Sequence, residues 1–139
     1  MKFVSFLMCV GLVHLASAAR AEVLSFDCPE TQAWPPATIV IDTQQRVWMQ
    51  EVTLDSGLIC HATFRDGVRA RVFSGPTTGY CEMLTGGGLV NHQVTIKGNE
   101  ISARLFDGRE LISWRTLNLR TGEVNTDQGV GNICRRRAG

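Results

Sequence analysis

The cysteines constrain this chain more than any other feature. Five are present, and Cys9 lies in an apolar N-terminal segment whereas Cys28, Cys60, Cys81 and Cys134 lie beyond it. Four cysteines are an even set, as a disulfide framework requires, and they allow three pairings. We favour the nested pairing, Cys28 with Cys134 and Cys60 with Cys81, because the first pair would join the two ends of the chain.

The N-terminal segment is predicted to be a cleavable signal peptide. Lys2 provides the positive charge, and residues 3–15 form an apolar run that is shorter than the roughly 20 residues needed to span a bilayer. Two small-x-small sites follow, at residues 16–18 and 19–21. We favour cleavage after Ala21, which would remove Cys9. The mature protein is then expected in the periplasm or outside the cell, where disulfides form.

Cleavage after Ala21 leaves 139 − 21 = 118 residues, enough for one hydrophobic core. We therefore expect a single β-rich domain over residues 22–139. Removing Lys2 and Arg20 from the 14 basic residues leaves 12 against 13 acidic ones, a net charge of −1, so no nucleic-acid partner is expected. The Arg135-Arg136-Arg137 run is either a contact for anionic lipid or sugar or, as we favour, a solvated tail.

Short runs of apolar and β-branched residues separated by turn residues predict an all-β fold. We expect an antiparallel meander that forms a small barrel or sandwich of about eight strands with two disulfides. Two stretches are predicted to be irregular, residues 29–37 and 75–88. Strands are predicted near residues 23–28, 38–42, 46–54, 58–65, 68–74, 89–97, 100–106 and 109–119, with a last one between 123 and 134.

The predicted hairpins can be tested for register, since paired strands must turn their apolar residues to one face. A two-residue Gly98-Asn99 turn satisfies this rule. At Asp66-Gly67 a two-residue turn fails the test, whereas a three-residue loop with Gly67 in the left-handed conformation satisfies it. The resulting pairs are Ile96 with Ile101, Val94 with Ala103, Phe64 with Val68, Ala62 with Ala70, and Cys60 with Val72.

A two-residue turn at Asp107-Gly108 would place Leu105 opposite Glu110 and Ile101 opposite Trp114. His92, Leu105 and Glu110 would then form one row across three strands. His92 and Glu110 could flank a small ligand as a polar anchor or an acid–base pair. The alternative, which we favour, is a buried structural histidine and a carboxylate at the rim of the sheet.

The remaining motif searches identify no catalytic or cofactor signature. The Gly86-Gly87-Gly88 run lacks the lysine of a phosphate loop, and no two cysteines have the C-x2-C spacing of a metal site. No cofactor or metal ion is therefore expected. Trp48 and Trp114 are predicted to fill the core, whereas Trp34, beside Pro35-Pro36, is the best candidate for an exposed aromatic contact.

The segment from Ser113 to Val124, followed by Gly131 and Cys134, resembles the closing strands of small uncharacterised exported proteins of proteobacteria. Three features recur in those proteins: an alternating strand, a turn that contains an arginine followed by threonine and glycine, and a final cysteine. The resemblance covers roughly the last quarter of the chain. It implies export and a β-rich fold, and it implies no activity.

Three functions are then compatible with the sequence. We favour a binding or inhibitory module that recognises an envelope or host protein through its irregular loops. The alternative is a lipocalin-like carrier of a small ligand in the periplasm, which would need an interior large enough for that ligand. A small hydrolase-type enzyme using His92 and Glu110 is the least favoured, and no transmembrane segment is expected after processing.

Overall fold

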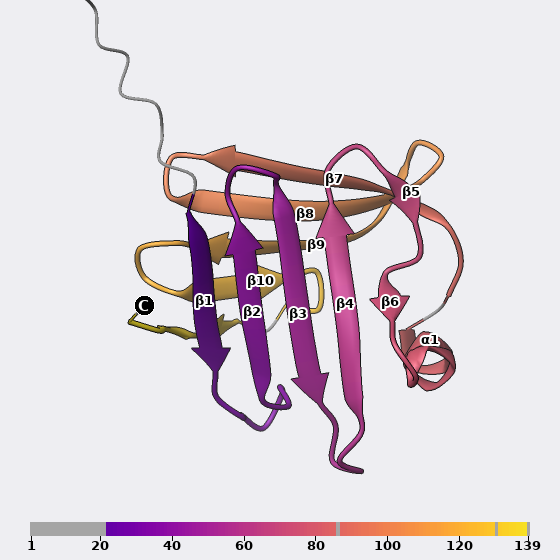
Figure 1. The fold of residues 1–139 in the computed structure, drawn as a ribbon, viewed down its shortest axis with the longest axis horizontal. Coiled ribbons are helices and arrows are strands. Elements are labelled where there is room, and N and C mark those ends of the chain that lie inside the picture. Colours follow the sequence, from indigo (N-terminus) through magenta and orange to yellow (C-terminus); the bar gives the residue numbers. More distant parts are fainter. Residues whose placement is uncertain (1–21, 86, 130, 139) are drawn as a thin grey trace, which may run out of the picture.

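The computed structural model describes residues 22–85, 87–129 and 131–138 and contains two antiparallel sheets of six strands each. The signal peptide predicted over residues 1–21 lies outside this range. The two sheets form two layers, and their strands cross steeply: those of the first sheet run vertically in Figure 1 and those of the second run horizontally behind them. None of the described residues forms a helix with the length and apolar character needed to cross a membrane.

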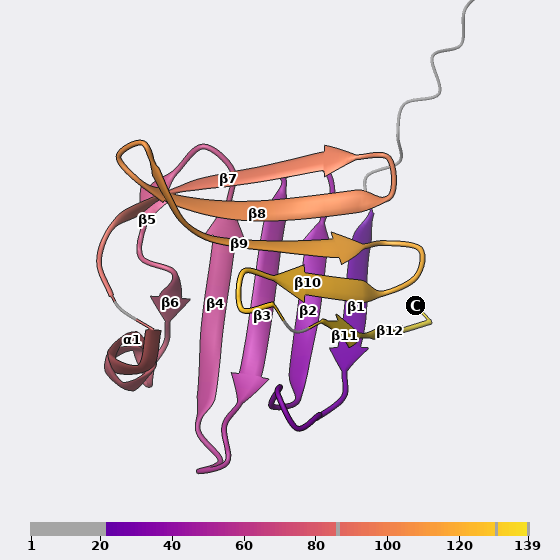
Figure 2. The ribbon, with the colours of Figure 1, turned by 180° about the vertical axis from the view of Figure 1, so that it is seen from behind.

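The first sheet has the order β12-β1-β2-β3-β4-β6, and the second has the order β11-β10-β9-β8-β7-β5. The long strands arise from the alternating segments identified in the sequence, and Figure 2 shows the second sheet from its outer side. The bounds in the first sheet are β1 Val23–Cys28, β2 Ala37–Asp42, β3 Val47–Thr53, β4 Ile59–Arg65, β6 Phe73–Ser74 and β12 Arg135–Arg136. Those in the second are β5 Arg69–Ala70, β7 Val90–Lys97, β8 Glu100–Asp107, β9 Glu110–Asn118, β10 Glu123–Thr126 and β11 Asn132–Ile133.

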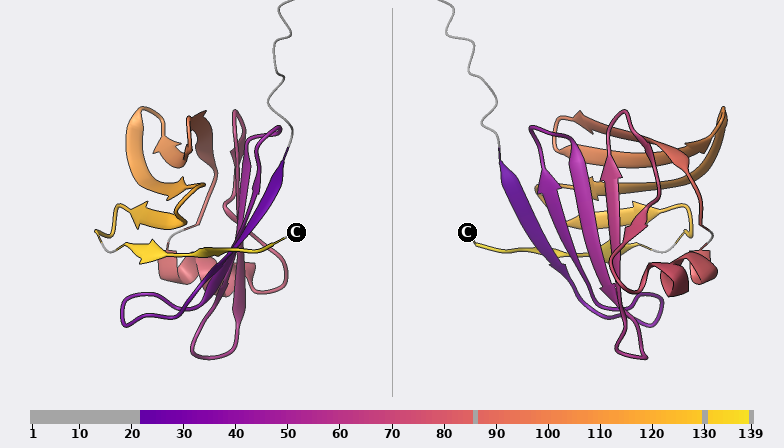
Figure 3. Two further views of the ribbon diagram at one scale, coloured as in Figure 1. Left: turned by 90° about the vertical axis from the view of Figure 1, so that its left-hand side faces the viewer. Right: turned by 45° about the vertical axis from the view of Figure 1, so that its right-hand side comes forward.

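The prediction of about eight strands is wrong, since the described residues form twelve, and the sheets do not close into a barrel. Four of the twelve strands contain only two residues, because the chain changes sheet at both sides of the sandwich. β5 pairs with β7 whereas β6 pairs with β4, and in the same way β11 pairs with β10 whereas β12 pairs with β1. Strands that switch sheet form the corners of such packings, and the C-terminal crossing is visible in Figure 3.

This change of sheet also overturns the register predicted for the Asp66-Gly67 hairpin. Gly67 is left-handed as predicted, with φ 76°. However, Ala62 pairs with Phe73 instead of Ala70, because Ala70 has moved to the second sheet beside Val90. The Gly98-Asn99 hairpin has the predicted register, with Ile96 opposite Ile101.

The core lies between the inner faces of the two sheets. Trp48 is fully buried there, as predicted. Trp114 is not in the core: it pairs with the exposed Arg104 on the outer face of the second sheet and is only half-buried. The largest fully buried side chains are Trp48, Phe26, Phe64, Ile39, Ile41, Ile101 and Leu117.

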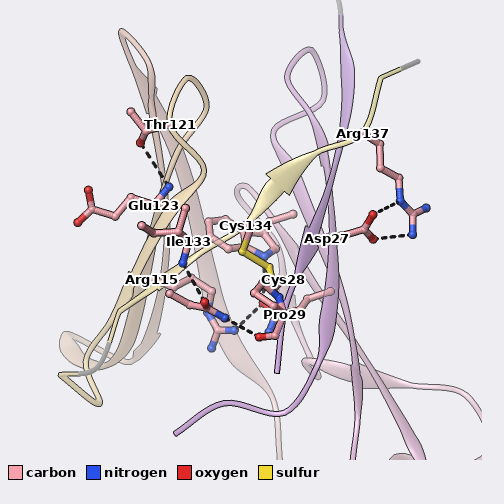
Figure 4. The surroundings of a disulfide bond; sticks show 12 residues. Asp27, Cys28, Pro29, Arg115, Thr121, Glu123, Ile133, Cys134 and Arg137 are labelled. Carbon is pink, nitrogen blue, oxygen red and sulfur yellow. Dashed lines mark hydrogen bonds and ion pairs between the residues drawn. A yellow bond between two sulfur atoms is a disulfide. The ribbon is translucent and has the colours of Figure 1, made fainter. Parts of the chain in front are cut away.

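Both predicted disulfides are present. Cys28–Cys134 joins β1 to the junction of β11 and β12, and Figure 4 shows it bridging the two layers. Cys60–Cys81 joins β4 to α1 (Thr78–Thr85), a helix inside the stretch predicted to be irregular. An isolated helix of this length would be unstable, so α1 depends on its attachments: the disulfide and an ion pair between Glu82 and Arg71 (3.0 Å).

The C-terminal arginines are ordered instead of forming a solvated tail. Arg135 and Arg136 form β12, and Arg137 donates from Nε and Nη2 to the carboxylate of Asp27 at 2.7 and 2.6 Å. Figure 4 shows this pair on the outer side of β1. The run therefore completes an edge of the first sheet.

The Asp27–Arg137 pair makes a testable prediction. Its hydrogen bonds, with the charges of Arg137 and Arg135, hold the pKa of Asp27 below its ordinary value despite opposing desolvation. A depressed pKa means that the pair stabilises the fold above the ordinary Asp pKa and that this contribution is lost as the pH falls through the folded value. We expect Arg137→Ala to raise the Asp27 pKa in an NMR titration of its carboxyl carbon. Arg136→Ala should leave this pKa unchanged, and an equal rise in both variants would contradict the assignment.

Candidate functional site

The most unusual side chain in the interior is Arg115, on β9. The predicted register placed Trp114 opposite Ile101 on the core face, but the structure places Leu117 there and puts Arg115 opposite Ala103. There are two causes. The turn lies one residue later than predicted, with Asp107 opposite Glu110, and the β8–β9 pairing is irregular where Leu105 is opposite Ser113 and Phe106 is opposite Leu111. Ile112 is the extra residue of this bulge. The strand beyond it is shifted by one position, so an arginine points between the sheets.

Arg115 contacts two side chains of the first sheet. Its Nη1 donates a hydrogen bond to Gln50 Oε1 (3.3 Å), which also accepts a hydrogen bond from Trp48 Nε1 (3.2 Å). The guanidinium carbon lies over the ring of Phe64, 4.3 Å from its centroid, a cation–π arrangement. Figure 4 shows the side chain in the space between the two layers. Its direct contacts are therefore a neutral amide and an aromatic ring.

The charge of Arg115 is poorly compensated. Burial lowers its pKa to about 10, and the more distant Asp127 opposes this shift. A guanidinium with a pKa of about 10 is still positively charged at neutral pH. No carboxylate of residues 22–85, 87–129 and 131–138 lies within ion-pair distance of it. The interior thus contains a partly desolvated cation without an anionic partner in direct contact.

Arg115 lines three adjoining hollows between the sheets, of about 790, 280 and 210 Å³. The largest lies between the β1–β2 loop and the β10–β11 loop, and the second reaches α1. We call their combined space the Arg115 cleft. Its walls include Trp34, Gln50, Val52, Phe64, Val72, Phe73, Leu105, Ile112, Ser113, Arg115 and Asp127. The two smaller hollows are thus mainly apolar, the largest has a mixed polar and apolar lining, and one cation lies where the three hollows meet.

The two carboxylates that border the cleft differ in their surroundings. Glu82, on α1, accepts hydrogen bonds from Arg71 Nη1 at 3.0 and 3.1 Å, so its charge is balanced locally. Asp127 is exposed, and its backbone N–H donates to the carbonyl of Trp114 (3.2 Å) at the mouth of the largest hollow. Neither carboxylate is paired with Arg115.

The structure separates the residues that the sequence identified as site candidates. Trp34 is half-buried and packs against the core, where it forms part of the wall of the Arg115 cleft. Glu110 is exposed, and its backbone lies opposite that of Asp107 at the tip of the β8–β9 hairpin. The predicted row of His92, Leu105 and Glu110 is therefore wrong, since Ser113 is the residue opposite Leu105.

His92 is buried, with 4% of its surface exposed. Its Nε2 lies 3.0 Å from the carbonyl oxygen of Ala70; because a carbonyl can only accept, Nε2 carries the proton. Nδ1 has no hydrogen-bond partner among the described residues. The ring lies 6.1 Å from that of Phe64. The acid–base pair that a hydrolase reaction would need from His92 and Glu110 is not formed.

Sequence reasoning missed Arg115, although a signal for it exists. Leu117 and Leu119 lie two and four positions after Arg115, so alternation in this half of the strand places it on the core face. In the first half of the strand, alternation based on Ile112 and Trp114 would instead place the even-numbered residues on the core face. A change of phase within one strand indicates a bulge, and here the bulge determines which side chain enters the cleft.

A scan against protein-family models and searches of curated proteins and of solved structures found no match. In the described part of the chain, no group of three or more His, Cys, Asp or Glu side chains is placed to hold a metal ion. The site is therefore interpreted from its geometry and electrostatics.

Proposed function

We propose that this chain is an exported binding protein that holds a small, largely apolar molecule in the Arg115 cleft. The observation that carries the proposal is the space between the sheets. Its largest hollow, about 790 Å³, falls within the ~300–1,000 Å³ typical of ligand pockets. The two disulfides are compatible with a periplasmic or extracellular location.

The architecture supports a cleft that exists before the ligand arrives. The two sheets cross steeply, and Figure 3 shows the layers joined at their sides by the segments that change sheet. Cys28–Cys134 ties the layers together near one side, and Cys60–Cys81 holds α1 against β4 near the other. A site that is held open in advance loses less conformational entropy on binding.

Filling the cleft tests this proposal. Ser113 lines two of the hollows, so Ser113→Phe should occupy part of the space. We expect saturable binding of the neutral fluorescent probe phenylnaphthylamine to the unmodified protein. We expect the affinity for the probe to fall by about 10-fold or more in the variant, because losing part of the apolar contact in a pocket costs about 1–3 kcal/mol.

The matched control is Thr116→Phe on the same strand, because Thr116 pairs with Ser102 and Asn125 and lines none of the three hollows. It should bind the probe like the unmodified protein. Absence of saturable probe binding by the unmodified protein would reject the proposed function.

Recognition of an envelope or host protein is the second candidate. The feature that favours it is a group of exposed apolar side chains on and beside α1, Tyr80, Met83 and Leu89, which are 42, 83 and 55% exposed. Such side chains are common where proteins bind one another. The half-buried position of Trp34 in the cleft wall favours the first candidate. The probe experiment separates the two, since a protein contact at α1 does not require binding inside the cleft.

A further inference from the structure

We propose that the molecule held in the cleft is an anionic amphiphile, an apolar chain or ring system that ends in an oxyanion such as a carboxylate, and that Arg115 pairs with this head group. This inference rests on the proposed function and narrows it to one class of ligand.

The first argument is the missing anion. Each arginine that forms an ion pair among the described residues is substantially exposed: Arg46 with Asp66, Arg71 with Glu82, Arg136 with Glu22 and Arg137 with Asp27. Arg115 is held between the sheets with an amide and an aromatic ring as its direct contacts. A buried charge is costly unless it is paired. A ligand oxyanion would supply the pairing that the chain itself does not.

The second argument is access. Arg115 is part of the wall of all three hollows, so a head group can reach it while the apolar part of the ligand extends in either direction. Val52, Phe64 and Ile112 lie on these walls and would contact that part. A guanidinium has five N–H donors in a planar fork that matches a carboxylate. One N–H group of Arg115 is directed to Gln50, and this bond would fix the orientation of the fork.

The third argument is the charge at the borders of the cleft. Glu82 is balanced by Arg71, so it adds little negative potential inside. Asp127 is exposed at the mouth, where water and salt screen its charge. A cationic head group inside the cleft would lie near Arg115, which would disfavour its binding, and one at the mouth would meet only the screened charge of Asp127. The cleft therefore selects for a negative head group.

The test compares three ligands with the same ten-carbon chain, decanoate, decanol and decyltrimethylammonium, by displacement of phenylnaphthylamine. Each is measured with the unmodified protein, Arg115→Met and Arg115→Lys. In Arg115→Met the preference for decanoate over decanol should fall by about 10- to 100-fold, the loss expected for a charge-assisted hydrogen-bonded pair. Arg115→Lys should keep part of the preference, since lysine retains the charge without the fork. Decyltrimethylammonium should bind the unmodified protein more weakly than decanol.

A second measurement distinguishes recognition from support of the fold. Without ligand, the thermal midpoint of Arg115→Met should equal or exceed that of the unmodified protein, because replacing a buried charge with an apolar side chain of similar size is often neutral or stabilising. Affinity for phenylnaphthylamine itself should change little.

The outcomes separate the two proposals. If phenylnaphthylamine binds but the preference for decanoate is absent, or survives in Arg115→Met, the anionic ligand is rejected and the cleft remains a binding site. Arg115 would instead be a structural residue under the following result. Arg115→Met lowers both the thermal midpoint and the affinity for the probe, and Arg115→Lys restores both without a preference for decanoate. If the unmodified protein binds neither probe nor ligand, the proposed function is rejected together with this inference.

Discussion

Replacing Gly122 with alanine is expected to lower the free energy of unfolding by about 2–5 kcal/mol. Gly122 lies in the β9–β10 turn with φ +77°, and a Cβ atom there would overlap the backbone carbonyl oxygen of Cys134. The two residues are also hydrogen-bonded, from Cys134 N to Gly122 O at 2.8 Å. The backbone next to the Cys28–Cys134 disulfide would therefore have to move, in addition to the cost of a left-handed alanine.

Gly67→Ala is the matched control for this prediction. Its φ of +76° is almost the same, but no heavy atom lies within 4 Å of the position of its Cβ. It should lose only about 1–2 kcal/mol, the cost of the left-handed conformation. Urea unfolding measures both variants, and mass spectrometry reports whether the disulfide forms. Equal losses in the two variants would show that the contact with Cys134 is not the cause.

The double variant Cys28→Ala with Cys134→Ala is expected to lose about 3–5 kcal/mol, because a long closed loop gives the largest reduction in unfolded-state entropy. The two cysteines are 106 residues apart, so this disulfide restricts almost all of the chain that the structure describes. It also joins β1 to the segment that crosses between the sheets. Without it, β12 should separate more easily from the first sheet.

The other disulfide provides the comparison. Cys60 and Cys81 are 21 residues apart, and a loop of this size is worth about 3 kcal/mol in the same treatment. Guanidinium unfolding of the two double variants should therefore rank the 28–134 variant as the less stable. The reverse ranking would mean that α1 contributes more to the core than its position at the edge implies.

The sequence was sufficient to predict the parts of the fold that follow from local alternation. Residues 23–28 alternate between buried and more exposed positions and form β1 with the bounds predicted. The Gly98-Asn99 turn set the β7–β8 register correctly, because both flanking strands carry unambiguous apolar positions such as Val94 and Ala103. The nested disulfides followed from the expectation that a small exported domain ties its two ends together.

The features that the sequence did not predict depend on tertiary structure. A two-residue strand such as β5 is too short for alternation to define, so the change of sheet within residues 68–74 left no pattern. α1 has Tyr80 and Met83 exposed and is attached by Cys81, so it lacks the apolar stripe that identifies most helices. The turn lies at Gly108-Arg109 instead of Asp107-Gly108, which moved Glu110 out of the predicted row, and the bulge at Ile112 brought Arg115 into the interior.

The four two-residue strands also affect how the protein behaves at high concentration. Each sheet ends on both sides in one of them, β12 and β6 for the first and β11 and β5 for the second. A long exposed edge acts as a template on which further chains add as strands, and short edges remove that template. The outermost strand on each side of both sheets is thus too short to act as such a template, so the protein should resist fibrillar self-association at high concentration.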